Sequence, residues 1–230
     1  MELTDIVVEK MEDKEAWYGQ AAEYWRNVEP SVDGMLGGFE KISDVDCKGS
    51  LKFLKKLKQE NILTAPCHKA LDCGAGIGRV SKHFLLKVFD NVDIVEQCEE
   101  FTKQVHNYMD DQNLSNRIEN IYTIGLQQFE PKLNHYDLIW IQWVIGHLTD
   151  DDFVSLLKRC KEGLTPGGCI GIKDNVTSGE SVYDGDDSSV TRTFSELRNI
   201  FDAAGLTIRT WEAQKGFPSC LFNVNMYALS

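Results

Sequence analysis

The stretch that most constrains the fold is residues 69–79, which read KALDCGAGIGR. An apolar strand end runs into Asp72, and glycines then occupy alternate positions before Arg79. Glycine at this spacing allows a turn with positive φ and a close approach of the backbone to a ligand. The free N–H groups at the start of the following helix face the same point. The stretch is typical of a cofactor loop in a doubly wound α/β fold, where the ligand lies beyond the carboxyl ends of the strands.

The order of the glycines distinguishes between classes of cofactor. The dinucleotide fingerprint G-x-G-x-x-G requires a third glycine for close helix–strand packing, whereas Gly74, Gly76 and Gly78 give G-x-G-x-G. Downstream, the apolar run 92–96 ends in Glu96, 22 positions after Gly74, where an acidic side chain is expected to bind ribose hydroxyls. This combination suits a nucleoside without a pyrophosphate, such as S-adenosylmethionine (SAM). The alternative is an ordinary tight turn between a strand and a helix.

The rest of the chain alternates between strand and helix patterns. Strands are predicted over 69–73, 92–96, 118–124, 136–141, 168–173, 206–214 and 221–229. Helices are predicted over 12–27, 45–60, 78–89, 99–109, 150–162 and 192–204. Such alternation predicts a mainly parallel sheet with helices on both faces. The last two strands, joined by a turn, predict an antiparallel hairpin at the edge of this sheet.

Charge and cysteine usage bear on partners and compartment. The formal net charge is −12 and there is no basic stripe, so we expect no nucleic-acid partner and an attraction for basic protein ends. No apolar run approaches the roughly 20 residues of a membrane helix, and the acidic start of the chain lacks the layout of a signal peptide. The 7 cysteines never form C-x-x-C. This argues against a disulfide framework or a metal site and for a cytoplasmic or nuclear location.

A second informative stretch is HYDLIWIQWVIGHLTDDD, residues 135–152. It predicts a buried strand with Gln142 and Trp143 at its carboxyl end, facing the cofactor. Trp143 either forms the wall of a substrate slot or belongs to the core. His147, in the loop that follows, is either a general base, a role that histidine can fill near neutral pH, or a structural residue. Thr149 or Asp150 is predicted to cap the next helix.

A third stretch, residues 170–192, leads from a strand end at Lys173 through Asp174 and Asn175 into a polar, acidic loop. Ser188 and Ser189 are predicted to cap the helix after it. The acidic residues of the loop are either routine helix caps or a pocket for a cationic substrate, with one carboxylate close to a transferred methyl group. They are Glu180, Asp184, Asp186 and Asp187.

Together these stretches resemble the family of α-N-terminal protein methyltransferases, which methylate the exposed N-terminal amine of proteins beginning Xaa-Pro-Lys or Xaa-Pro-Arg. The motifs that carry the resemblance are VDGMLGG, ALDCGAGIGR, IWIQWVIGHLTD, IKDN and DDSSV. It extends from about Tyr18 to Leu229. The resemblance implies a class I, Rossmann-like, seven-stranded methyltransferase that uses SAM, releases S-adenosylhomocysteine (SAH) and needs no metal. It also implies a helical extension over residues 1–65 that acts as a substrate lid, and a methyltransferase domain over 66–230.

The family's functional residues can be carried over where the motifs match. The implied cofactor contacts are Gly74, Gly76, Arg79, Glu96, Leu126, Gln127 and Gln142, with Glu96 standing where the family usually has aspartate. The implied substrate contacts are Trp25, Leu36, Trp143, Asn175, Asp184, Asp187, Ser189 and Phe222. His147 and Asp187 match proposed proton acceptors, and Asn175 would orient the amine. Phe222 departs from the family, which commonly has a tyrosine there, and the missing hydroxyl should weaken peptide binding by ~1 kcal/mol.

The predicted function is transfer of methyl groups from SAM to the free α-amine of proteins that begin Xaa-Pro-Lys/Arg. Three alternatives remain. The chain could be another class I methyltransferase acting on a small molecule or a side chain, or an inactive methyltransferase-like partner subunit. A nucleotide-dependent oxidoreductase is the third, and the missing third glycine disfavours it.

Overall fold

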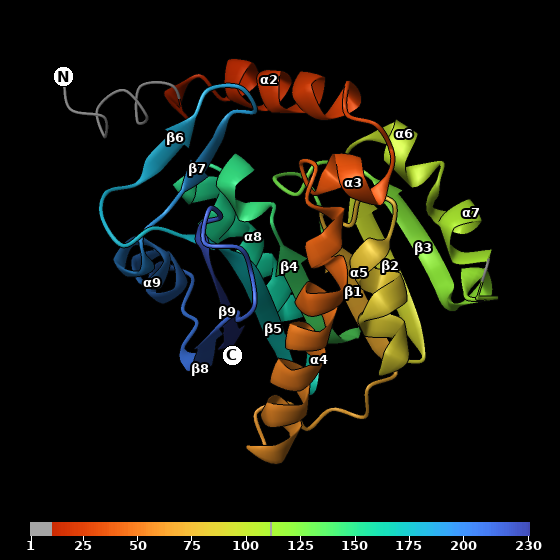
Figure 1. Ribbon diagram of the computed structural model, residues 1–230. Coiled ribbons are helices and arrows are strands. Elements are labelled where there is room, and N and C mark those ends of the chain that lie inside the picture. The colour runs from red at the N-terminus through yellow and green to blue at the C-terminus, as the bar shows by residue number, and fades with distance from the viewer. Residues whose placement is uncertain (1–10, 111) are drawn as a thin grey trace.

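The computed structural model describes residues 11–110 and 112–230 and contains a seven-stranded sheet in the order β3-β2-β1-β4-β5-β9-β8 (Figure 1). Most of the acidic start of the chain lies outside the described residues. The strands of this sheet are β1 (Lys69–Cys73), β2 (Asn91–Glu96), β3 (Ile118–Thr123), β4 (Tyr136–Gln142), β5 (Leu164–Val176), β8 (Ile208–Ala213) and β9 (Asn223–Leu229).

Strands β1 to β5 are parallel, as the alternation in the sequence predicts. Strand β9 lies antiparallel between β5 and β8, so the predicted hairpin at the sheet edge is confirmed. The longer helices are α2 (Lys14–Arg26), α4 (Ser43–Gln59), α8 (Asp150–Gly163) and α9 (Phe194–Ala203). The shorter ones are α3 (Val32–Met35), α5 (Arg79–His83), α6 (Glu99–Thr102), α7 (Val105–Asp110) and the 3₁₀ turns η1 (Glu40–Ile42), η2 (Leu85–Lys87), η3 (Ser115–Arg117) and η4 (Ile145–His147).

The sheet separates two hydrophobic clusters, because successive side chains of a strand point to opposite faces. On one face, α4, α5 and α7 pack against residues such as Leu138 and Trp140 of β4. On the other face, α8 and α9 pack against residues such as Ile139 and Ile141 of the same strand. Helix α4 lies before the first strand, yet Phe53 and its apolar neighbours belong to the first cluster. The chain is thus a three-layer α/β fold.

The loops that carry the predicted site residues meet at one edge of the sheet. Parallel strands β1, β2, β4 and β5 end there together, and helix α2 crosses above this edge (Figure 1). Helix α2 begins after Asp13, whose side chain caps it, and ends at Arg26. The fold therefore covers the carboxyl ends of the strands with a segment that precedes the first strand.

Several predicted elements differ in detail from the observed ones. The helix expected over 78–89 is divided into α5 and η2 at Phe84, whose φ of −127° is not helical. The helix expected over 99–109 is divided into α6 and α7, and β5 is longer at both ends than predicted. The glycine-rich stretch 30–39 contains helix α3, which Ser31 caps by accepting the N–H of Gly34.

The prediction that Ser188 and Ser189 cap a helix is wrong. The acidic loop instead folds into a small antiparallel hairpin, β6 (Val182–Asp184) with β7 (Ser189–Thr191). Helix α9 begins later, because Thr193 and Glu196 form a capping box in which each side chain accepts the backbone N–H of the other residue. Thr149 caps α8, one of the two caps predicted there. Within the described residues, no helix has the length and apolar character required to cross a membrane.

Candidate active site

The glycine loop after β1 has the backbone geometry that its sequence predicts. Gly74, Gly76 and Gly78 all have positive φ, at 70°, 57° and 90°. A Cβ atom on Gly74 would lie 2.7 Å from the side chain of Val144, so this position has no room for another residue. Helix α5 follows directly and begins at Arg79. Because these positions are glycines, no side chains fill the space beside the ends of β1 and β4.

Glu96, at the end of β2, faces this loop with a buried carboxylate. Its Oε2 accepts the N–H of Gly76 at 3.0 Å and its Oε1 accepts the N–H of Cys98 at 2.7 Å. Burial raises the pKa of Glu96, and these backbone donors oppose the shift. A carboxylate oxygen has two lone pairs, so each oxygen can accept one further hydrogen bond. That arrangement fits the two hydroxyls of a ribose.

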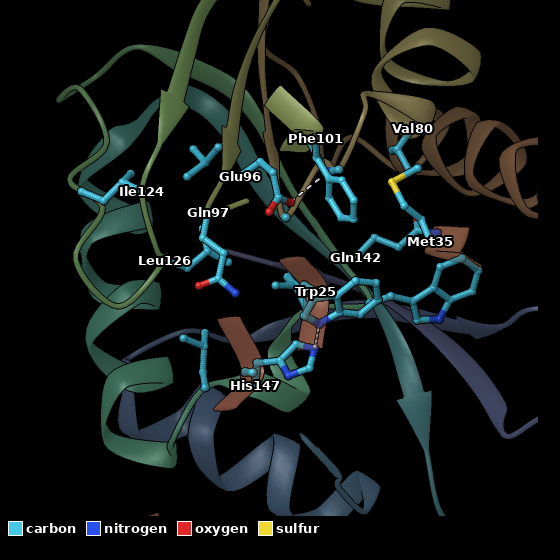
Figure 2. A pocket seen from close by; sticks show the side chains of 18 of the residues that line it. Trp25, Met35, Val80, Glu96, Gln97, Phe101, Ile124, Leu126, Gln142 and His147 are labelled. Atoms are coloured by element: carbon cyan, nitrogen blue, oxygen red, sulfur yellow. Dashed lines mark hydrogen bonds between the residues drawn. The ribbon is translucent and has the colours of Figure 1, made fainter. Parts of the chain in front are cut away.

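A first cavity lies between the glycine loop, Glu96 and helix α2 (Figure 2). Apolar side chains such as Phe101, Ile124 and Leu126 form much of its wall near Glu96, as a purine ring requires. Figure 2 shows Glu96 and Gln97 at one end and Met35 with Gln142 at another. The cavity is lined by every residue predicted to bind the cofactor: Gly74, Gly76, Arg79, Glu96, Leu126, Gln127 and Gln142. Its residues fit SAM, because they offer a ribose acceptor, an apolar slot and a cation.

The loop that carries Leu126 and Gln127 is held by Arg159 of α8, a residue that the sequence analysis missed. Its Nη2 donates to the carbonyl oxygens of Leu126 at 3.0 Å and Gln127 at 3.3 Å, and its Nε to that of Phe129 at 2.9 Å. In the sequence, Arg159 is one of several charges on an amphipathic helix, and no local pattern separates it from its neighbours. It acts on the cavity through the backbone of the loop.

A second cavity adjoins the first and is also lined by many of the predicted substrate residues. Its wall includes Asn175, Asp187, Ser189 and Phe222, the last of which is 45% exposed. Five residues line both cavities: Trp25, Met35, Leu36, Trp143 and His147. The two cavities therefore meet at this group of side chains. Trp143, with φ at 52°, lies at the meeting point and not in the core.

His147 lies in η4 between the two cavities and is fixed by indole groups from α2. Trp25 Nε1 donates to His147 Nε2 at 3.0 Å, as Figure 2 shows, and Trp17 Nε1 donates to the His147 carbonyl at 2.7 Å. An indole N–H can only donate, so Nε2 must be the unprotonated nitrogen. The proton then lies on Nδ1, which is 3.3 Å from the carbonyl oxygen of Ser188. In this geometry the imidazole is neutral, and the lone pair of Nε2 accepts the hydrogen bond from Trp25.

Arg192, at the end of the β6–β7 hairpin, holds the segment around His147. Its guanidinium donates to the carbonyl oxygens of Ile145 at 2.9 Å and Leu148 at 2.6 Å, and it pairs with Asp150 at 2.7 Å. Arg192 is only 3% exposed. The acidic hairpin and the His147 turn are therefore joined by a buried cation that the sequence analysis did not identify.

Asp187, in the turn between β6 and β7, has an open acceptor position. Its Oδ1 is buried and has no hydrogen-bond partner among residues 11–110 and 112–230. Burial raises the pKa of this carboxyl above its ordinary value, although a hydrogen bond from Ser189 opposes the shift. A buried acceptor without a donor costs free energy unless a ligand supplies one. The structure thus provides a site for an N–H donor in the second cavity.

Asp184 is the one predicted substrate residue that lines neither cavity. It is exposed on β6, and its Oδ1 accepts the backbone N–H of Asp186. Its charge still reaches the rim of the second cavity. Tyr24 lines that rim, and its pKa is raised by burial and then by the charges of Asp187, Asp184 and Asp186. The mouth of the cavity is therefore negative.

Asn175 follows a second buried carboxylate, Asp174, at the end of β5. Asp174 Oδ2 accepts the N–H groups of Val144 and Ile145, and its Oδ1 accepts the N–H of Asn175. Burial raises the pKa of Asp174 to about 6. The carboxylate thereby fixes the strand end that presents Asn175 to the second cavity. No group of three His, Cys, Asp or Glu side chains in the described parts of the chain is placed to hold a metal ion.

Comparison with known proteins shows the family of the chain. A family model described as AdoMet dependent proline di-methyltransferase matches residues 13–230. N-terminal Xaa-Pro-Lys N-methyltransferase 1-A of Xenopus laevis is 46% identical over 222 residues, covering 96% of this chain and 98% of that protein. The Homo sapiens N-terminal Xaa-Pro-Lys N-methyltransferase 1 is 42% identical with the same coverage.

The solved structures agree in fold. A SAM-dependent methyltransferase from Leishmania major superposes with a TM-score of 0.84 at 35% sequence identity, covering 94% of this chain and 84% of that one. A complex of DhpI with SAH, at 17% identity, has a TM-score of 0.64 over 92% of this chain and 95% of that one, which supports the fold alone.

Proposed function

Since the chain belongs to the family of AdoMet-dependent proline di-methyltransferases and is a SAM-dependent methyltransferase, we propose that it methylates the free α-amine of proteins beginning Xaa-Pro-Lys or Xaa-Pro-Arg. The observation that carries the proposal is the junction of the two cavities. A cavity that fits SAM opens beside Trp25, Trp143 and His147 into a second cavity with an unpaired, buried carboxylate oxygen on Asp187. A methyl donor in one cavity and an amine in the other would meet there.

The cofactor would be held by the first cavity, with Glu96 on the ribose, Leu126 and Gln127 beside the adenine, and Arg79 on the carboxylate. Bound in this way, SAM supplies a methyl group already activated by its sulfonium. The chain's own residues then have to bring a neutral amine into line with that group. Such alignment accounts for most of the expected rate enhancement.

We propose Asp187 as the residue that takes the amine proton. An α-amine has a pKa of about 7.7–8.0, so it needs only a modest base. An arriving ammonium donates one proton to the Asp187 carboxylate, whose raised pKa makes it a better acceptor than an ordinary aspartate. The lone pair freed on the amine would accept the methyl group, and SAH would leave. Asn175, in the same cavity, orients the amine by its side-chain carbonyl.

His147 has a different part in this proposal. Its Nε2 lone pair accepts the Trp25 indole N–H, so the imidazole cannot take a proton until that hydrogen bond breaks. In the structure, His147 and Trp25 hold each other in place where the two cavities meet. This distinction separates two residues that the family resemblance presents as equivalent proton acceptors.

The substrate preference follows from the wall and the mouth of the second cavity. Proline at position two would contact Trp143 and Leu36, which line both cavities. Lysine or arginine at position three would then reach the negative mouth formed by Asp184, Asp186 and Asp187, a charge-assisted contact. The SAM-bound protein therefore presents an apolar wall to the proline and carboxylates to the cation.

Two peptides test the substrate directly. We expect mass spectrometry to detect one or more added methyl groups on Ser-Pro-Lys-Arg-Ile-Ala after incubation with SAM, and none on its N-acetylated form. Equal methylation of both would place the reaction on the lysine and contradict the proposal. Methylation of neither, with SAH binding intact, would favour a different substrate or an inactive partner subunit. A peptide with glutamate at position three should have a KM at least about tenfold higher, as loss of a charged contact implies.

A substitution tests the proton acceptor. Asp187→Asn keeps the shape of the side chain but removes the charge, so we expect kcat to fall by roughly 10²-fold or more. Asp151→Asn is the control, because Asp151 is an exposed carboxylate on α8 that lines neither cavity. An unchanged kcat in Asp187→Asn, with the same peptide KM, would refute the role.

A further inference from the structure

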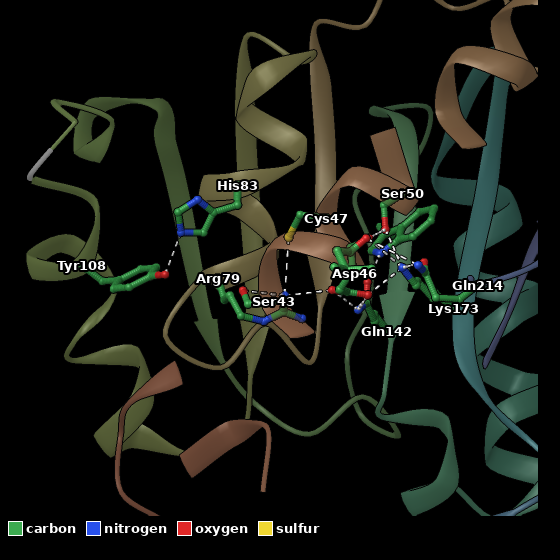
Figure 3. A network of polar contacts seen from close by, with 12 residues as sticks. Ser43, Asp46, Cys47, Ser50, Arg79, His83, Tyr108, Gln142, Lys173 and Gln214 are labelled. Atoms are coloured by element: carbon green, nitrogen blue, oxygen red, sulfur yellow. Dashed lines mark hydrogen bonds and ion pairs between the residues drawn. The ribbon is translucent and has the colours of Figure 1, made fainter. Parts of the chain in front are cut away.

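A buried carboxylate behind the first cavity joins three elements of the fold. Asp46 of α4 is 0% exposed, and its Oδ2 lies 2.8 Å from Arg79 Nη1 while its Oδ1 lies 2.6 Å from Lys173 Nζ (Figure 3). The amide of Gln142 also donates to both carboxylate oxygens, at 3.0 and 2.9 Å. Figure 3 shows these side chains converging on Asp46 from α4, α5, β4 and β5. Two of them, Arg79 and Gln142, line the first cavity.

Asp46 fixes the orientation of both cavity residues. The Gln142 carbonyl accepts the Trp140 indole N–H at 2.9 Å, so its amide group must point at Asp46. Arg79 is held through Nη1, the one guanidinium nitrogen of this residue that is hydrogen-bonded within the described part of the chain. Its other nitrogens donate no hydrogen bond within the described residues, and Arg79 lines the first cavity. A guanidinium held in this way can receive a carboxylate through two parallel N–H groups.

Lys173 does not compete for the cavity. Its Nζ donates to the Asp46 carbonyl oxygen, Ser50 Oγ and Gln214 Oε1, and the residue is fully buried and lines neither cavity. The direct contacts of Asp46 thus place two cations, Arg79 and Lys173, against one carboxylate. Asp72 is the next carboxylate; it accepts a hydrogen bond from Ser81 and interacts with Arg79 through charge, without a hydrogen bond.

The charge state of Asp46 agrees with this arrangement. Burial alone would raise the pKa of Asp46, but Lys173 and Arg79 hold the pKa below its ordinary value. Burial lowers the pKa of Lys173, and Asp46 opposes that shift. Asp46 is therefore a permanent anion at neutral pH, bonded to a cation on each side.

We propose that Asp46 is a positioning residue for the methyl donor: Lys173 holds the Asp46 carboxylate in place, and Asp46 orients the Arg79 guanidinium so that Arg79 receives the α-carboxylate of SAM or SAH. The inference depends on cofactor binding and is independent of the peptide substrate. It gives helix α4, which precedes the first strand, a role in cofactor recognition.

The test compares two ligands in the full-length protein by isothermal titration calorimetry. SAH carries the α-carboxylate, whereas 5′-methylthioadenosine has the adenine, ribose and sulfur but lacks the amino-acid part. For Asp46→Asn we expect the Kd of SAH to rise about 10- to 100-fold, as for loss of a charged hydrogen bond. The Kd of 5′-methylthioadenosine should stay within about twofold. Asp44→Asn, an exposed carboxylate on the same helix, should change neither.

A merely structural role would give a different result. If Asp46→Asn weakened both ligands by the same factor, or weakened neither, the proposal would be overturned. Asp46→Asn leaves Lys173 without its carboxylate, so the double variant Asp46→Asn/Lys173→Met removes that buried cation as well. This variant should show the same selective loss of SAH affinity, and equal losses for the two ligands would again reject the role. Failure of peptide methylation, with these affinities as expected, would reject only the proposed substrate.

Discussion

Arg159 offers the sharpest test of how the fold shapes the cofactor cavity without touching the cofactor. Its guanidinium holds the carbonyl oxygens of Leu126, Gln127 and Phe129 at 2.9–3.3 Å, and its side chain is 18% exposed. Hydrogen bonds to a charged group contribute about 1.5–3 kcal/mol each. Water can replace part of that at a partly exposed site, so we expect the unordered loop in Arg159→Met to be favoured over the ordered one by about 1.4 kcal/mol. A ligand that binds only the ordered loop has its affinity reduced in proportion to the fraction of molecules in which the loop is ordered. That fraction is here about one tenth, so Kd rises about tenfold.

The assay is titration calorimetry with SAH and with 5′-methylthioadenosine. Both contain adenine, so both should bind about tenfold more weakly to Arg159→Met, in contrast to the selective effect expected at Asp46. At an SAH concentration of about 100 times the wild-type Kd, stabilisation against unfolding should fall from about 2.7 to about 1.4 kcal/mol. Arg159→Lys should behave more like the methionine variant, because a point charge cannot bridge three carbonyl groups. Lys158→Met, an exposed neighbour on the same helix, is the control. Unchanged affinities in a folded Arg159→Met protein would refute the reasoning.

Three further outcomes follow from single contacts. Gly74→Ala should lower the free energy of unfolding by about 1–3 kcal/mol in chemical denaturation, because φ is 70° and the added Cβ would lie 2.7 Å from Val144; an unchanged midpoint would contradict it. Trp25→Phe should cost about 1 kcal/mol in the same assay, because the His147 Nε2 hydrogen bond at 3.0 Å is lost; an equal loss in Tyr24→Phe would show the hydrogen bond is not the cause. Since burial raises the pKa of Asp187, kcat should be lost as the pH falls through that raised value and the carboxylate protonates; a kcat constant down to pH ~4 would contradict this.

The sheet was largely predictable because its central strands β1, β2 and β4 are buried on both faces and end at clear turn signals. Strand β1 has the predicted bounds, and β2 and β4 differ from prediction by one residue at one end. The hairpin β6–β7 was missed because its strands are only three residues each, too short for their period or composition to mark them. Helix breaks such as that at Phe84 depend on tertiary packing, which no local pattern records.

The site residues that the sequence did reveal lie in motifs at the ends of strands. The residues that it did not reveal act on the cavities through hydrogen bonds and ion pairs with other residues: Asp46, Arg159, Lys173 and Arg192. In the sequence, Asp46 and Arg159 resemble solvated charges on amphipathic helices. A signal was present for one of them, because Asp46 shares the helical face of Ser50, Phe53, Leu54 and Leu57 at spacings of four, seven, eight and eleven. A carboxylate on an otherwise apolar stripe predicts a buried partner.

The segment before the first strand is part of the catalytic architecture for a physical reason. Parallel strand ends and their loops contact a ligand from one side and leave its other side open to solvent. Here α2 and α3 cover that open side, and Trp25, Met35 and Leu36 line both cavities. Helix α4 places Asp46 next to Arg79. The same side chains would therefore contact the methyl donor and the peptide amine. An N-terminal segment that covers both ligands couples exclusion of water to the alignment of donor and acceptor, which methyl transfer to an amine requires.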